Sequence, residues 1–204
     1  MLFLILLIVY ILFSIFINTC PIVYQWDESF IILLQNCLSS FSNEIPILLD
    51  DKLFNFFLFL PQILFSIIFF FKRKFLDIAF VWGVSYSSYL FNIIQKDIVQ
   101  RPRPNLDLHI IPHPDSFSFV SNHTLITFTL YAVVTYYVFQ LTDNRIIRNF
   151  ILFFSILWAL VMGFSRIWLG VHNPTDVIAA YLLGSVFFVG FIHLRSFIKK
   201  YIGL

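Results

Sequence analysis

The chain has 204 residues, of which 60% are hydrophobic and only 12% are charged, and Phe alone fills 28 positions. A soluble domain carries about twice this charged fraction, so the polar surface is too small to cover a water-soluble globule. The net charge of +2 gives no indication of a nucleic-acid-binding surface. The composition therefore predicts an integral membrane protein.

Crossing about 30 Å of hydrocarbon takes roughly 20 apolar residues. The stretches that approach this length are residues 2–17, 53–71, 75–94, 124–141, 150–167 and 174–194. Backbone groups in lipid must pair within their own segment, so we predict an all-α fold, a six-transmembrane-helix bundle in one domain, 1–204. The first stretch lacks the basic start and cleavage site of a secretory signal, which predicts a retained helix. Pro61 is expected to kink the second.

Residues 30–49, between the first two spans, are apolar but contain Gln35, Asn36 and Pro46. This pattern predicts an interfacial helix, because a further crossing would invert the charge pattern described next. Cys20 and Cys37 would lie on the same side of the membrane, so a disulfide between them is possible.

Basic residues set the orientation, because loops rich in Lys and Arg stay in the cytoplasm. In the predicted topology, eight basic residues lie on one side of the membrane: Lys72, Arg73, Lys74, Arg145, Arg148, Arg195, Lys199 and Lys200. Both termini are therefore predicted to be cytoplasmic. Residues 96–122 and 166–173 lie on the opposite side, yet they hold four of the remaining basic residues. Charge placed against the rule indicates a functional role.

The first polar cluster follows the third span and contains Lys96, Arg103 and Pro104. Prolines on both sides of Arg103 stiffen the loop and favour an extended backbone. A Lys point charge and an Arg fork suit phosphate, since Arg can bind two oxygens in parallel. Interfacial charges that contact lipid head groups are an equally good interpretation of this cluster alone.

The second cluster, Ser121-Asn122-His123, precedes the fourth span. Ser121 is expected to be an N-cap, and the free backbone N–H groups at a helix start bind anions. His123 would face the same spot and could donate a proton. For this cluster alone, a capped helix with an interfacial His is the better interpretation.

The third cluster runs from Ser165-Arg166 to His172-Asn173-Pro174-Thr175-Asp176. Asn173 as cap and Pro174 at the first helical position predict a sharp start of the last span. Asp176 could accept a proton from one ring nitrogen of His172 and leave the other free to attack. A helix-dipole role would explain Asp176 but neither Arg166 nor His172.

Together the clusters resemble the signature of the type 2 phosphatidic acid phosphatase (PAP2) superfamily, which includes vanadium haloperoxidases: K-x6-R-P, then P-S-G-H, then S-R-x5-H-x3-D. The matching residues are Lys96, Arg103 and Pro104 in the first motif and Ser165, Arg166, His172 and Asp176 in the third. The second motif departs, since Val120 replaces Pro and Asn122 replaces Gly. Asn tolerates the left-handed backbone that Gly suggests, but its side chain could crowd a phosphate or add a hydrogen bond.

The resemblance implies a PAP2/haloperoxidase-like helical core at about residues 75–194. It also implies hydrolysis of a lipid phosphate or pyrophosphate without a metal or other cofactor. His172 would attack phosphorus to form a phosphohistidine, Asp176 would orient its ring, and His123 would protonate the leaving oxygen. The implied phosphate ligands are Lys96, Arg103, Ser121, Asn122 and Arg166.

The sequence does not select one lipid. An outward-facing site on a small chain suits recycling of undecaprenyl pyrophosphate in a bacterial inner membrane, with the active site facing the periplasm. Lipid A, phosphatidate and phosphatidylglycerol phosphate are the alternatives. A non-catalytic phospholipid-binding or transport member is a further alternative, and Asn122 favours it. His109 and His113 do not suggest a metal site, because Pro112 breaks any helix between them. No oligomeric state is predicted.

Overall fold

The computed structural model describes residues 1–202, without the side chains of Asp51 and Ile202, and this part of the chain contains helices but no strand. The helices are α1 (Leu2–Thr19), α2 (Pro21–Cys37), α3 (Glu44–Leu48), α4 (Phe54–Phe71), α5 (Phe75–Val99), α6 (Asn122–Leu141), α7 (Arg145–Trp168) and α8 (Pro174–Ile202). A short π-helix, η1 (Leu49–Leu53), joins α3 to α4, and a 3₁₀ turn, η2 (Leu106–Leu108), follows α5. The predicted all-α fold is confirmed.

Five of these helices, α1, α4, α6, α7 and α8, are long and apolar enough to cross a membrane. The predicted count of six is therefore not confirmed. The remaining candidate, α5, has 25 residues but carries Ser85, Ser88, Asn92, Gln95 and Lys96. All five side chains are buried, so these polar residues face the interior of the bundle.

Three helices extend at least five residues beyond the apolar stretches that predicted them. α5 continues from residue 94 to Val99, α7 begins at Arg145 and not at residue 150, and α8 runs past residue 194 to Ile202. Each added segment contains charged residues, so apolar run length underestimated these helices. α4 continues through Pro61 without a break in its helical assignment.

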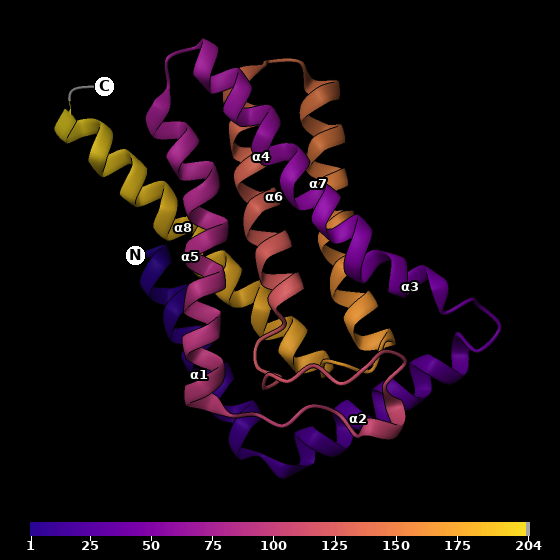
Figure 1. Ribbon diagram of the computed structural model, residues 1–204. Coiled ribbons are helices and arrows are strands. Elements are labelled where there is room, and N and C mark those ends of the chain that lie inside the picture. Colours follow the sequence, from indigo (N-terminus) through magenta and orange to yellow (C-terminus); the bar gives the residue numbers. More distant parts are fainter. Residues whose placement is uncertain (203–204) are drawn as a thin grey trace.

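The predicted interfacial helix at 30–49 is wrong in its bounds. The segment forms two helices, because α2 begins at Pro21 and ends at Cys37, and α3 starts only at Glu44. Ser39, Ser40 and Ser42 occupy the intervening turn, where Ser side chains compete for backbone hydrogen bonds. α2 lies across one end of the bundle (Figure 1).

Cys20 and Cys37 are both free thiols. Cys20 precedes the 17-residue helix α2, and Cys37 is its last residue. At a rise of 1.5 Å per residue the helix holds the two cysteines about 25 Å apart. The disulfide that the sequence left open is therefore excluded.

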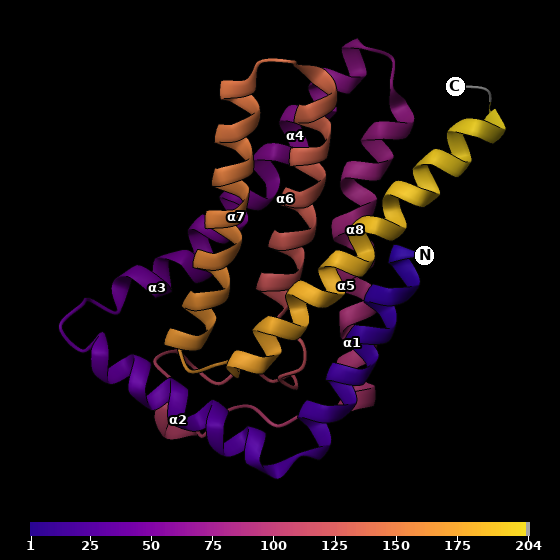
Figure 2. The ribbon, with the colours of Figure 1, turned by 180° about the vertical axis from the view of Figure 1, so that it is seen from behind.

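α6 lies in the middle of the bundle and packs against α5, α7 and α8. Its buried side chains include Leu130, Val134 and Tyr137, which form a core with Phe69 of α4 and Met162 of α7. The α4–α5 turn, the α6–α7 turn and the far end of α8 gather at one end of the bundle, and the long segment after α5 lies at the other (Figures 1 and 2). The three basic segments thus share one end, as their charges predicted.

Candidate active site

A cavity of about 660 Å³ lies where the start of α6 meets the ends of α5 and α7. Six of the eight predicted site residues line it: Lys96, Arg103, Asn122, His123, Arg166 and His172. Asp176 and Ser121 are fully buried and lie behind this lining. The structure therefore brings the three sequence clusters together.

The first cluster supplies two cations from different local structures. Lys96 lies in the last turn of α5, whereas Arg103 follows the end of that helix. Gln100, the C-cap residue that follows α5, has a left-handed backbone (φ 50°) that turns the chain into the loop. Ser116 holds both cations, because its Oγ lies 3.3 Å from Lys96 Nζ and its carbonyl oxygen accepts from Arg103 Nε at 2.7 Å. Sequence reasoning did not identify Ser116.

The second cluster starts α6 as predicted, but Ser121 differs in detail. It occupies the N-cap position, yet its side chain makes no capping hydrogen bond to the backbone, and its Oγ lies 2.9 Å from Thr124 Oγ1. Asn122 is the first helical residue and does not have the left-handed backbone expected for a replaced Gly. Its Oδ1 accepts a hydrogen bond from Asn92 Nδ2 at 3.3 Å, which holds the side chain in place.

The third cluster depends on a tight turn between α7 and α8. Gly170 has φ +72°, and a Cβ atom there would lie 2.0 Å from the carbonyl oxygen of Leu108. Gln35 of α2 donates hydrogen bonds to the carbonyls of Leu108 at 2.8 Å and Trp168 at 2.9 Å. The two loops are thus joined above α2, and α8 begins at Pro174 as predicted.

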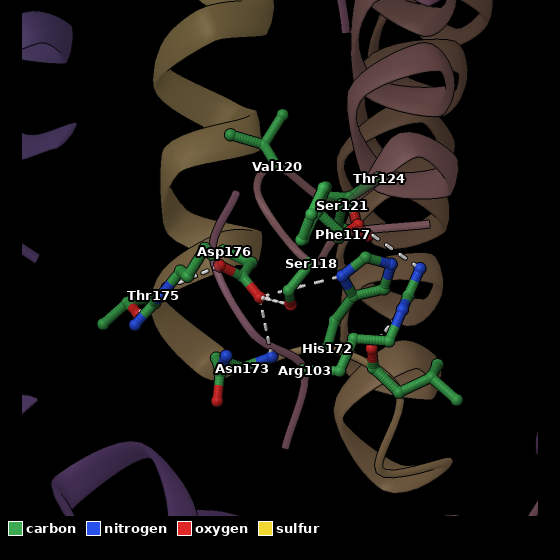
Figure 3. A network of polar contacts seen from close by, with 12 residues as sticks. Arg103, Phe117, Ser118, Val120, Ser121, Thr124, His172, Asn173, Thr175 and Asp176 are labelled. Atoms are coloured by element: carbon green, nitrogen blue, oxygen red, sulfur yellow. Dashed lines mark hydrogen bonds and ion pairs between the residues drawn. The ribbon is translucent and has the colours of Figure 1, made fainter. Parts of the chain in front are cut away.

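The predicted histidine–carboxylate pair is present. Nδ1 of His172 lies 3.7 Å from Oδ2 of Asp176 (Figure 3), longer than a hydrogen bond but within reach after a small rotation. Asp176 is held by donors on its other sides: the backbone N–H of Asn173 at 2.9 Å, the Ser118 hydroxyl, and Nη1 of Arg101 at 2.5 Å. The carboxylate is therefore fixed independently of the imidazole.

Arg101 and Asp27 were missed by the sequence analysis. Arg101 lies between two carboxylates, Asp176 and Asp27, the second at 2.8 Å, and all three side chains are fully buried. Thr175 adds hydrogen bonds to Asp27 from its backbone N–H at 3.1 Å and its hydroxyl at 2.6 Å. An acidic residue within an apolar helix was the available signal for Asp27, but nothing local named its partner.

Asp50, in η1, was also missed. Its carboxylate pairs with Arg166 and lies 3.3 Å from Nε2 of His123. It comes from the segment before α4, far in sequence from all three motifs. Only the fold places it in the cavity.

The His172 imidazole and the cations around it differ in charge at neutral pH. Burial holds the pKa of His172 well below its usual range, and Arg103, Lys96 and Arg166 add to this, although Asp176 opposes it. His172 is therefore neutral at neutral pH. Burial lowers the pKa of Arg103 to about 10, which leaves this side chain charged.

Three cations, the amino end of a helix and a neutral imidazole aligned by a carboxylate define a site suited to a phosphate group. The model of the PAP2 superfamily matches residues 74–200. The chain belongs to this superfamily.

A sequence comparison and a structure comparison agree with this assignment. The chain is 32% identical over 120 residues to phosphatidylglycerophosphatase B of Bacillus subtilis (strain 168), a match that spans 58% of each protein. The fold is similar to the crystal structure of the first transmembrane PAP2 type phosphatidylglycerolphosphate phosphatase from Bacillus subtilis, with a TM-score of 0.79 and 24% identity. That alignment covers 97% of this chain and 98% of the other. The predicted PAP2-like fold is confirmed.

Proposed function

We propose that this protein is a membrane lipid phosphatase that hydrolyses a lipid phosphate through a phosphohistidine intermediate. The observation that carries the proposal is the buried pair of His172 and Asp176, which opens into the same cavity as Lys96, Arg103 and Arg166. A neutral imidazole beside three cations can attack an anion that those cations bind.

In the first step, a ring nitrogen of His172 forms a bond to phosphorus while the bond to the lipid oxygen breaks. Asp176 accepts a hydrogen bond from Nδ1–H and stabilises the positive charge that develops on the ring, so the other nitrogen, Nε2, attacks. His123 gives a proton to the departing oxygen, and the lipid alcohol leaves.

In the second step, water attacks the phosphohistidine. His123, now neutral, takes a proton from that water, and His172 regains its lone pair as the bond between nitrogen and phosphorus breaks. Lys96, Arg103, Arg166 and the backbone N–H of Asn122 bind the oxygens as charge is redistributed. Ser121 is placed to support this helix start, and direct contact of its hydroxyl with phosphate stays a prediction.

Phosphatidylglycerol phosphate is the substrate favoured by the similarity to phosphatidylglycerophosphatase B and to the solved phosphatidylglycerolphosphate phosphatase of Bacillus subtilis. The sequence alone ranked undecaprenyl pyrophosphate first, followed by lipid A, with phosphatidate a further alternative. All share a phosphate on a long apolar lipid, and the cations of this cavity do not distinguish between them. A panel of these lipids tests the ranking.

The distribution of charge supports an orientation with both termini in the cytoplasm and the cavity facing the periplasm of a bacterial inner membrane. The basic segments at the α4–α5 turn, the α6–α7 turn and the end of α8 lie at one end of the bundle (Figure 1). The segment after α5, which contributes Arg103 to the cavity, lies at the other end. Cysteine-accessibility labelling of Arg145→Cys and Leu106→Cys in intact cells would test this orientation.

A non-catalytic lipid-binding member is the competing proposal, and Asn122 in the second motif favours it. Its side chain is held by Asn92 at the wall of the cavity, and both predicted histidines are present. Catalysis is therefore the better-supported proposal.

The decisive experiment measures phosphate released by purified protein from each lipid. His172→Ala should lower turnover by at least about 1,000-fold without loss of protein from the membrane. Acid-labile phosphate should label wild-type protein in a rapid quench and be absent from His172→Ala. Lys96→Ala should raise the KM and lower kcat. Comparable phosphate release by His172→Ala would exclude the proposed nucleophile.

A further inference from the structure

Asp50 places a carboxylate at the wall of the cavity, beside cations that could bind an anion. Its Oδ1 contacts Nη1 of Arg166 and lies 3.3 Å from Nε2 of His123. The side chains of Asp50 and His123 are 21% and 25% exposed, so both reach the cavity from its wall. Asp50 belongs to the π-helix η1, a geometry found often at functional sites.

A carboxylate here opposes the binding of phosphate. It pairs with one of the three cations and repels a dianionic substrate. If Arg166 were its only partner, Asp50 would lower the affinity for phosphate and contribute nothing else to the reaction. Its second contact, with His123, indicates what it contributes.

We infer that Asp50 is the positioning residue of the general acid, holding His123 through Nε2 and favouring the imidazolium form. The inference rests on the proposed function. Nδ1, the other ring nitrogen, then carries the proton that passes to the lipid oxygen, because both nitrogens of an imidazolium are donors. Asp50 itself touches neither phosphorus nor the leaving oxygen.

Phe54 fixes the same imidazole from a second side. It lies one helical turn after Asp50, and its ring centroid is 4.1 Å from that of His123. The junction of η1 and α4 thus supplies both a carboxylate and an aromatic ring to this histidine. A residue whose only task was to neutralise Arg166 would not need this arrangement.

Charge explains why the acid needs such a partner. Lys96, Arg103 and Arg166 line the same cavity and oppose a further positive charge on the ring. The carboxylate of Asp50 offsets them. In the first step the proton moves from His123 to the lipid alkoxide as the phosphorus–oxygen bond breaks, and in the second His123 recovers a proton from water.

The effect of losing Asp50 should depend on the leaving group of the substrate. An alkoxide from a lipid phosphate monoester is a poor leaving group and depends on protonation, whereas an aryl oxide departs without it. The test compares phosphatidate with p-nitrophenyl phosphate in the same detergent micelles. Asp50→Asn should lower kcat on the order of 10- to 100-fold for phosphatidate and less than about threefold for the aryl ester, with KM unchanged or lower for both.

Asp97→Asn is the matched control, because Asp97 also lines the cavity and its replacement removes the same charge. It should leave the ratio of the two kcat values as in the wild type. Asp50→Glu keeps the carboxylate and should restore part of the phosphatidate activity, which also covers the case in which Asp50→Asn folds poorly.

Equal losses on both substrates in Asp50→Asn, or no loss on phosphatidate, would overturn the inference and leave the proposed function intact if His172→Ala is inactive. A wild-type protein that releases phosphate from none of the proposed lipids would overturn the proposed function, and the inference with it.

Discussion

The carboxylate of Asp27 on α2 lies 2.8 Å from the guanidinium of Arg101, and both side chains are fully buried. Arg101 in turn contacts Asp176, the partner of His172. Burial by itself would lower the pKa of Arg101, but the two carboxylates outweigh burial and raise it. The helix across the end of the bundle is thereby joined to the proposed nucleophile through one arginine.

Asp27→Asn should lower both stability and turnover, because it leaves Arg101 with one carboxylate and weakens the hold of α2 on α8. We expect a loss of about 1–3 kcal/mol and a lower Tm in detergent. Glu28→Gln is the control, since Glu28 is exposed on the same helix. Equal Tm values for the two variants would show that the buried pair does not stabilise the fold.

Asn122→Pro tests the backbone N–H proposed to bind phosphate. Proline is favoured at the first helical position, and Ser121 before it is already extended (φ −63°, ψ 113°), so the helix start should persist. Removing one oxyanion donor should lower kcat about 100-fold. Asn122→Gly keeps the N–H and should stay within about threefold of wild type. If Asn122→Pro retained full turnover, this N–H would have no role.

Gly170→Ala should disrupt the turn that presents His172. Its positive φ costs a non-Gly residue about 1–2 kcal/mol, and the new Cβ would overlap the Leu108 carbonyl at 2.0 Å. We expect a lower Tm and a lower kcat. At Gly83 a Cβ atom would make an ordinary contact 3.7 Å from Phe191, so Gly83→Ala should be neutral or stabilising. Tolerance of both changes would contradict this account of the turn.

The depressed pKa of His172 predicts how stability changes with pH. Its unfolded pKa is about 6.5, so between the folded and unfolded values the unfolded chain binds more protons. The contribution of this neutral imidazole is complete above pH of about 6.5 and is lost as the pH falls, by at most about 1.4 kcal/mol per pH unit. Tm measured at decreasing pH should fall more steeply in wild type than in His172→Gln. Parallel curves would show that His172 is not buried in its neutral form.

Local sequence predicted the helices, and the errors lie where hydrophobicity alone does not set a helix boundary or a buried face. Apolar runs located the cores of the long helices, but polar ends and the interior-facing polar residues of α5 escaped a rule based on hydrophobicity. The Ser-rich turn at 38–43 divided a segment read as one helix. The α5 error arises because residues such as Asn92 are buried against other helices and do not face lipid.

The sequence by itself determined the membrane class, the family and the spacing that sets Asp176 one helical turn from His172. These are local properties, since apolar run length, prolines at helix starts and the helical period act within a few residues. The tertiary structure decided which distant carboxylates enter the site. Asp27 contacts Arg101 from α2, and Asp50 contacts His123 and Arg166 from η1. No local pattern encodes these contacts, because they depend on how the helices pack.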